Sequence, residues 1–190
     1  TAVKVTVPIS KRKTVPVIAD FTNIPSGFSK SSISYAIDHP TVTIIGTPDA
    51  IDKTTSVTLS AIDLTSVSTA SKSFELYPKL PDGVRLLDSI DHFVVTVDTS
   101  GYSEKTFTIS DIRYKGLSSG LSATTDSVIK NVKICGPRAS INRLNSGMLY
   151  ATVDLSGKSA GEHTVIVTIM CDSYNDVWQV GSYSTTVKIK

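Results

Sequence analysis

Cysteine and histidine are scarce in this sequence of 190 residues. Its two cysteines, Cys135 and Cys171, exclude the dense disulfide framework of small secreted proteins and leave room for one bridge. We favour two reduced thiols, because a buried Cys packs like a small apolar residue. The three histidines, His39, His92 and His163, lie far from one another and from both cysteines. Metal-ligand spacing is therefore absent, and we expect no metal and no cofactor.

Charge is also low, at 19% of the residues with a net charge of +2. Residues 1–99 carry nine basic and ten acidic side chains, and residues 100–190 carry ten and seven, so neither half has the charge of a polyanion binder. The one basic cluster, Lys11-Arg12-Lys13, is shorter than a typical nucleic-acid or lipid patch, and we interpret it as a solvated strand end.

Long apolar runs are missing, because no stretch approaches the roughly 20 apolar residues of a membrane span. The start at Thr1 shows neither an initiator Met nor a signal-peptide pattern. We therefore expect the chain to be a piece of a longer protein.

Small β-forming residues are abundant instead. The chain has 27 Ser and 23 Thr, and 40% of its residues are hydrophobic. Val, Ile and Thr recur in short alternating runs, which is typical of pleated, half-buried strands. We predict an all-β protein with little helix.

One set of motifs occurs twice along the chain. Residues 41–46 recur as residues 131–136, so that Gly46 corresponds to Gly136. Three further anchors recur in the same order: Lys13-Thr14 as Lys105-Thr106, residues 24–28 as residues 117–121, and residues 61–65 as residues 152–156. All four offsets lie between 90 and 93 residues. We predict two tandem modules, residues 1–98 and residues 99–190.

Each module is expected to follow one plan. Gly27 or Gly120 marks a turn after the first strand, and an alternating strand then ends at Gly46 or Gly136, where a side chain would block a turn or a close neighbour. The expected elements are first strands at residues 15–21 and 107–114, short helical turns at 47–51 and 137–141, and closing strands at 93–97 and 185–189.

Asp63 and Asp154 occupy matching positions, which invites a catalytic interpretation. A short carboxylate at a strand end more often accepts backbone N–H bonds in a turn, and we favour that role. Gly83 belongs to Leu80-Pro81-Asp82-Gly83, which predicts a hairpin between strands at residues 74–76 and 84–87. Its counterpart in the second copy would join residues 165–171 to residues 177–180.

Tyr174, Trp178 and Tyr183 lie close together near the C-terminus. Aromatic side chains beside polar residues can anchor a protein partner or stack on a sugar. The three aromatic side chains can also belong to a hairpin and cover the core of the module, and we favour this interpretation.

These motifs together resemble the YbbR-like domain, a module of bacterial envelope proteins that occurs in tandem arrays. The residues that carry the resemblance are Ile24-Pro25-Ser26-Gly27-Phe28, residues 40–46, Asp63-Leu64-Thr65 and residues 80–84, with Gly120, Gly136 and Asp154-Leu155-Ser156-Gly157 in the second copy. The second copy lacks the Pro before its alternating strand and the Pro-Asp-Gly turn.

The resemblance implies two small barrel-like β modules with crossing hairpins, each with at most one short helical turn. It also implies a place outside the membrane of a Gram-positive bacterium, behind an N-terminal membrane helix, and a role in regulating a membrane diadenylate cyclase and thus cyclic-di-AMP. Expected partners are that cyclase and further copies of the repeat, with no nucleic acid.

An enzyme is the least favoured class, because no nucleophile in the sequence has a nominated base and no phosphate loop or dinucleotide motif occurs. The alternative to a regulatory module is an adhesion or glycan-binding module of the cell surface, since short Ser/Thr-rich β domains also build stalks.

Overall fold

The structure, a computed structural model, describes residues 9–125 and 128–190. Residues 1–8 of the first predicted module and residues 126–127 of the second lie outside the described residues. About 49% of the described residues are in strands and about 12% in helices, and the sheets are curled into a half-barrel and a near-barrel. The predicted all-β class is confirmed.

The chain divides into two compact units. Unit 1 comprises residues 1–22, 34–62 and 73–97, and unit 2 comprises residues 23–33, 63–72 and 98–190. Two short segments from the first half of the sequence, residues 23–33 and 63–72, thus belong to unit 2. The module boundary at residue 98 stays a prediction.

Unit 1 is built on a five-stranded sheet of order β8-β5-β1-β4-β9. Strand β1 pairs antiparallel with β4 and parallel with β5. A three-stranded sheet of order β3-β10-β7 accompanies it, and β2 pairs with β6. The bounds are β1 Lys11–Ile18, β2 Phe21–Thr22, β3 Tyr35–Ile37, β4 Thr41–Gly46, α1 Pro48–Lys53, β5 Val57–Leu59, β6 Ile62–Asp63, β7 Ser73–Leu76, β8 Pro78–Lys79, β9 Val84–Leu86 and β10 Phe93–Val97.

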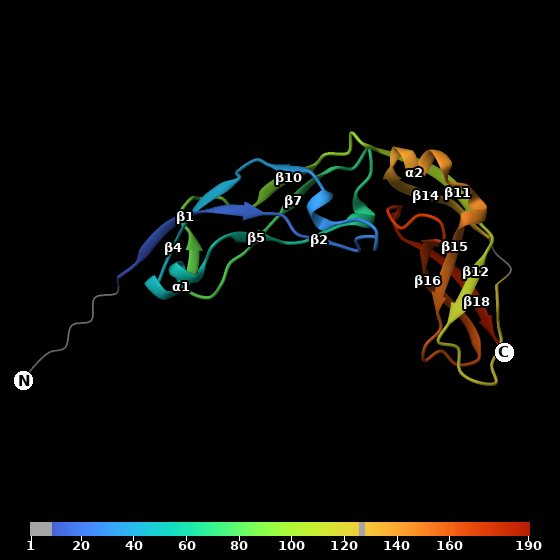
Figure 1. The fold of residues 1–190 in the computed structure, drawn as a ribbon. Helices are drawn as coiled ribbons and strands as arrows, with labels where there is room; N and C mark the ends of the chain where they lie inside the picture. Colours follow the sequence, from blue (N-terminus) through green and yellow to red (C-terminus); the bar gives the residue numbers. More distant parts are fainter. Residues whose placement is uncertain (1–8, 126–127) are drawn as a thin grey trace, which may run out of the picture. The chain divides into compact units, whose positions relative to one another are not determined.

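Unit 2 contains a three-stranded sheet of order β11-β14-β17 and a five-stranded sheet of order β12-β15-β16-β18-β13. Helix α2 lies against β11 and β14 (Figure 1). The bounds are β11 Tyr102–Ile109, β12 Ile112–Lys115, β13 Ala123–Thr124, β14 Ile129–Pro137, α2 Arg138–Arg143, β15 Leu149–Asp154, β16 Gly161–Cys171, β17 Trp178–Val180 and β18 Tyr183–Ile189.

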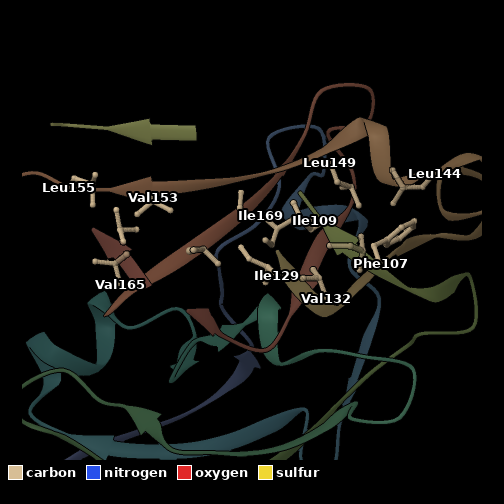
Figure 2. Packing of buried hydrophobic residues seen from close by; sticks show 14 of the residues in the cluster. Phe107, Ile109, Ile129, Val132, Leu144, Leu149, Val153, Leu155, Val165 and Ile169 are labelled. Atoms are coloured by element: carbon tan, nitrogen blue, oxygen red, sulfur yellow. The ribbon is translucent and has the colours of Figure 1, made fainter. Parts of the chain in front are cut away.

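The core of unit 2 follows from strand alternation. Val165, Val167 and Ile169 on β16 are buried, whereas Ile166 between them is 72% exposed. Successive side chains of a strand point to opposite faces, so one face of the sheet is apolar and buried. Figure 2 shows Val165 and Ile169 meeting side chains of β11, β14 and β15, with Leu144 after α2 at one end.

The two copies match in detail. Lys13 lies opposite Ile44 on the neighbouring strand, and Lys105 lies opposite Ile134. The Lys13 ammonium donates to the carbonyl of Thr54, just after α1, at 2.9 Å, and the Lys105 ammonium donates to the carbonyl of Leu144, just after α2, at 2.9 Å. The lysine anchors found in the sequence, Lys13 and Lys105, therefore have the same structural neighbours.

The expected short helical turns are present as α1 and α2, and their inward residues Ile51 and Ile141 are buried. Three further 3-10 turns, not predicted, lie at Lys30–Ser32, Leu64–Ser66 and Ser146–Met148. Each follows a Ser, Asp or Asn whose side chain accepts a backbone N–H two residues on, which stabilises a single turn.

The predicted hairpins are wrong. Gly83 and its neighbours join β8 to β9, which lie at opposite edges of their sheet, while β7 pairs with β10. In the second copy β16 pairs with β15 and β18, and β17 pairs with β14. The first strands both begin and end earlier than expected, at Lys11–Ile18 and Tyr102–Ile109, because β4 and β14 extend far enough to pair with their first residues. The last residues of the predicted strand 107–114 belong to a separate strand, β12.

Candidate interaction site

Glu104, Cys135 and Trp178 form a row across the three-stranded sheet of unit 2, here called the outer row. Glu104 pairs in register with Cys135, which pairs in register with Trp178. Residues in register on adjacent strands point to the same face. Ile134, the neighbour of Cys135, belongs to the core of unit 2, so the outer row lies on the opposite face of the sheet.

Residues 63–72 cover the outer row through polar contacts. The indole Nε1–H of Trp178 donates to the carbonyl of Val67 at 3.1 Å. The backbone N–H and the hydroxyl of Thr69 both donate to the Glu104 carboxylate, the hydroxyl at 2.8 Å. The N–H of Gly181 donates to the carbonyl of Thr65 at 2.8 Å. This segment is thus held along its length by β11, β17 and the turn that follows.

Residues 23–33 cover the same face with an aromatic contact. The ring of Phe28 lies edge-on to Trp178, with centroids 5.9 Å apart, and Tyr102 meets Trp178 at 5.3 Å and 87°. Such edge-to-face pairs add about 0.5–1.5 kcal/mol beyond the area they bury. The N–H of Gly27 donates to the carbonyl of Asn175 at 2.8 Å.

Burial of this face changes the ionisation of two of its residues. The Cys135 thiol is fully buried, and burial first, then the nearby Glu104 charge, raises its pKa to about 12. For Glu104, burial acts to raise the pKa, but the hydrogen bonds from Thr69 and the ion pair with Lys133 at 3.3 Å outweigh it and lower the pKa. The carboxylate therefore stays charged and holds Thr69.

The three predicted aromatics have different surroundings. Trp178 is 5% exposed on the outer face. Tyr174 and Tyr183 are partly buried against the core of unit 2. The Tyr183 hydroxyl accepts the N–H of Lys133 and donates to the carbonyl of Val180, both at 2.8 Å. Trp178 is therefore the member of this group that belongs to the outer row.

The predicted turn glycines lie where neighbouring atoms leave no room for a side chain or where φ is positive. A Cβ on Gly46 would lie 2.0 Å from the carbonyl oxygen of Gly83, and one on Gly136 would lie 2.9 Å from a Val177 methyl. A Cβ on Gly27 would lie 2.1 Å from the Asn175 side chain. Gly83 and Gly120 have φ values of +77° and +84°, which suit glycine.

Asp63 and Asp154 both cap turns. An Asp63 carboxylate oxygen accepts from the N–H of Thr65 at 2.9 Å, and Asp154 accepts from the N–H of Ser156 at 3.0 Å. The other Asp63 oxygen accepts from Asn23 at 2.8 Å. These hydrogen bonds occupy both carboxylates in local structure.

Sequence reasoning missed Glu104, Cys135 and Phe28 as members of this site. The repeat alone gives no signal for this row, because Glu104, Cys135 and Trp178 come into register only once β11, β14 and β17 are paired. Periodicity does not say which strands pair, so the row emerges only from the fold.

Within residues 9–125 and 128–190, no group of three or more His, Cys, Asp or Glu side chains is arranged to hold a metal ion. Across the same residues no helix is long and apolar enough to span a membrane. Both cysteines are free thiols.

The fold and this face define an all-β repeat whose outer sheet surface binds polypeptide segments. Among solved structures, the chain is similar to SuR18C from Streptococcus thermophilus, at 30% identity over 50% of this chain and 89% of that chain, with a TM-score of 0.33. It is also similar to a YbbR-like protein from Streptococcus pneumoniae TIGR4, at 16% identity over 100% of this chain and 98% of that chain, with a TM-score of 0.34. A YbbR-like protein is what the sequence motifs predict. No protein-family model matches the chain, and no curated protein matches it.

Proposed function

We propose that this chain is a non-enzymatic interaction module from the extracytoplasmic part of a membrane-anchored regulator, and that the protein it regulates is a membrane diadenylate cyclase. The class of function is supported by the outer row of unit 2, where Trp178, Glu104 and the turn after β17 bind polypeptide segments through backbone carbonyls and N–H groups. The choice of cyclase is supported by the YbbR-like motifs.

Contacts of this kind suit recognition better than catalysis. They bury an aromatic anchor and satisfy its polar atom, which is the arrangement of a binding hot spot. The recurring carboxylates that invite a catalytic interpretation, Asp63 and Asp154, are engaged by backbone N–H groups.

The test is reconstitution of the full-length membrane protein with the diadenylate cyclase of the same organism in proteoliposomes. We expect the two proteins to co-purify and the rate of cyclic-di-AMP formation from ATP to change when the regulator is present. Gly46→Val, which disrupts unit 1, serves as the inactive control, and Gly101→Ala, where an added Cβ meets nothing within 4 Å, is the matched silent control. An unchanged rate without co-purification rejects the cyclase as the partner.

A further inference from the structure

Unit 1 has a row that corresponds to the outer row of unit 2. Arg12 pairs in register with Ile45, and Ile45 pairs in register with Arg85. The repeat places Arg12 at the position of Glu104, Ile45 at that of Cys135 and Arg85 at that of Trp178. This second row, here called the arginine row, lies on β1, β4 and β9.

No segment covers the arginine row among the residues of unit 1 that the structure describes. Arg12 and Arg85 are exposed, Ile45 is only half-buried, and Leu87, just beyond β9, is 48% exposed. Cys135 and Trp178, at the positions of Ile45 and Arg85, are buried. Two exposed cations on either side of a half-buried aliphatic side chain form a surface to which a partner of opposite charge is complementary.

The two arginines are also the unengaged cations of this strand region. Lys11 forms an ion pair with Asp52, and Lys13 donates to the carbonyl of Thr54. Among the described residues, no ion pair or hydrogen bond of the Arg12 or Arg85 side chain is found. Neighbouring strands lie roughly 5 Å apart, so the two arginines flank Ile45 at roughly 10 Å from one another.

The outer row has Glu104 where the arginine row has Arg12, and this difference determines the chemistry of the partner that the arginine row can bind. In unit 2 the carboxylate of Glu104 accepts hydrogen bonds from Thr69. An arginine in the same place has only donors and needs acceptors, and a carboxylate is the best of these because it bonds the guanidinium at two points. Ile45 and Leu87 add an aliphatic contact.

We propose that the arginine row binds a loop of a partner protein that carries carboxylates on either side of an aliphatic side chain. The loop covers the arginine row of unit 1 in the same way as residues 63–72 cover the outer row of unit 2. This inference rests on the proposed role in protein–protein contact and adds the chemistry of the partner, without depending on the cyclase.

A second copy of this chain is not that partner. In the second copy, the segment that corresponds to residues 63–72 closes its turn with the same type of hydrogen bond: Lys158 N–H donates to the Leu155 carbonyl at 3.0 Å, as Val67 N–H donates to the Leu64 carbonyl at 3.0 Å. The turns differ at Gly157, which has a φ of +71°, whereas Ser66 belongs to a 3-10 helix. The repeat aligns Lys158 with Val67 and Ala160 with Thr69. A lysine opposite Arg85 repels, so the wild-type chain is kept from docking head to tail.

This mismatch supplies a test with purified protein alone. The triple variant Lys158→Glu/Ser159→Leu/Ala160→Glu gives the segment two carboxylates on either side of an aliphatic side chain. We expect the wild type to sediment as a monomer and the variant to associate at about 0.05 M NaCl, with the association lost at about 0.5 M NaCl because salt screens exposed charges. Adding Arg12→Gln or Arg85→Gln should weaken that association roughly tenfold each.

Thermal melting of each variant, followed by circular dichroism, verifies that it folds. Absence of association, or association that the arginine substitutions leave unchanged, overturns the proposal. Binding of wild-type chain to phosphatidylglycerol vesicles that is lost on Arg12→Gln/Arg85→Gln also overturns it, by assigning the arginines to a lipid surface. None of these measurements involves a cyclase, so the partner chemistry and the cyclase assignment fail separately.

Discussion

Gly46 and Gly136 occupy the same place in the two copies, but what they approach is different. A Cβ on Gly46 would lie 2.0 Å from the backbone carbonyl oxygen of Gly83, whereas a Cβ on Gly136 would lie 2.9 Å from a Val177 methyl and 3.1 Å from the Asp176 carbonyl oxygen. The approach is closer at Gly46, so the two glycines tolerate a side chain to different degrees. Their occurrence in the repeat predicts a close approach, whereas the neighbour that sets the cost is visible only in the structure.

We expect Gly46→Val to destabilise unit 1 by about 3 kcal/mol and Gly136→Val to destabilise unit 2 by about 1–2 kcal/mol. Chemical denaturation followed by amide hydrogen exchange measures both and assigns each loss to its unit. Gly101→Ala is the control and should change stability by less than about 0.5 kcal/mol. Equal, small effects at both glycines would show that the strand ends are not tightly packed.

Asp154 gives a prediction about pH. The hydroxyl and N–H of Ser156, and then the Lys115 ammonium at 3.3 Å, lower the pKa of Asp154 from 3.8 to about 2. Because the pKa is lower in the folded state, the stabilisation by this carboxylate is complete above about pH 4 and is lost as the pH falls towards about 2.

Carbon-13 NMR of the Asp154 carboxyl should therefore report a midpoint near pH 2. The Asp154→Asn variant should lose less stability than the wild type between about pH 4 and about pH 2. Parallel losses in the two proteins, or a midpoint near the ordinary value, would contradict the turn described here.

At the scale of elements, strand alternation predicts which segments are strands but not which strands pair. The closing strand β10 lies where its alternating Phe93, Val95 and Val97 predict, and all three are buried. The Pro-Asp-Gly turn at Gly83 indicates a reversal of the chain, and a hairpin would follow only if the flanking strands were neighbours. The strands on either side of this turn are not neighbours: β9 pairs with β4, and β8 pairs with β5.

The short helices supply a prediction about elements. Lys13 and Lys105 each hold the carbonyl just after α1 or α2, where the last helical carbonyls lack partners. We expect Lys13→Met and Lys105→Met each to lower stability by about 1 kcal/mol, since a charged hydrogen bond at a helix C-terminus is lost while the aliphatic stem is kept.

Equilibrium urea unfolding measures these losses. The neighbouring strand lysine Lys130, which is exposed, provides the matched control, and Lys130→Met should leave stability within about 0.5 kcal/mol. If Lys13 and Lys105 behave like Lys130, the two lysines do not stabilise the helices.

At the scale of the whole molecule, the duplication and the all-β class could be read from the sequence, because anchors such as Gly46 and Gly136 recur at a nearly constant offset. The membership of residues 23–33 and 63–72 in unit 2 could not. A repeat compares one copy with the other and says nothing about contacts between distant segments. Those segments bury Trp178, so its burial could not be predicted from the sequence either.

The central claim is that equivalent rows of the two copies differ in cover, with the outer row of unit 2 buried and the arginine row of unit 1 open. Cys135 and Ile45 occupy the equivalent middle positions, which allows a direct comparison of thiols. One protein carries Cys171→Ser and keeps Cys135, and the other carries Cys135→Ser, Cys171→Ser and Ile45→Cys.

The decisive measurement is the rate at which each thiol reacts with Ellman's reagent at about pH 8. Burial raises the pKa of Cys135 to about 12, and reaction requires an accessible thiolate. We predict that the thiol at position 45 reacts at least about 100-fold faster than Cys135. Equal rates would show that the two rows are covered alike and would contradict the account.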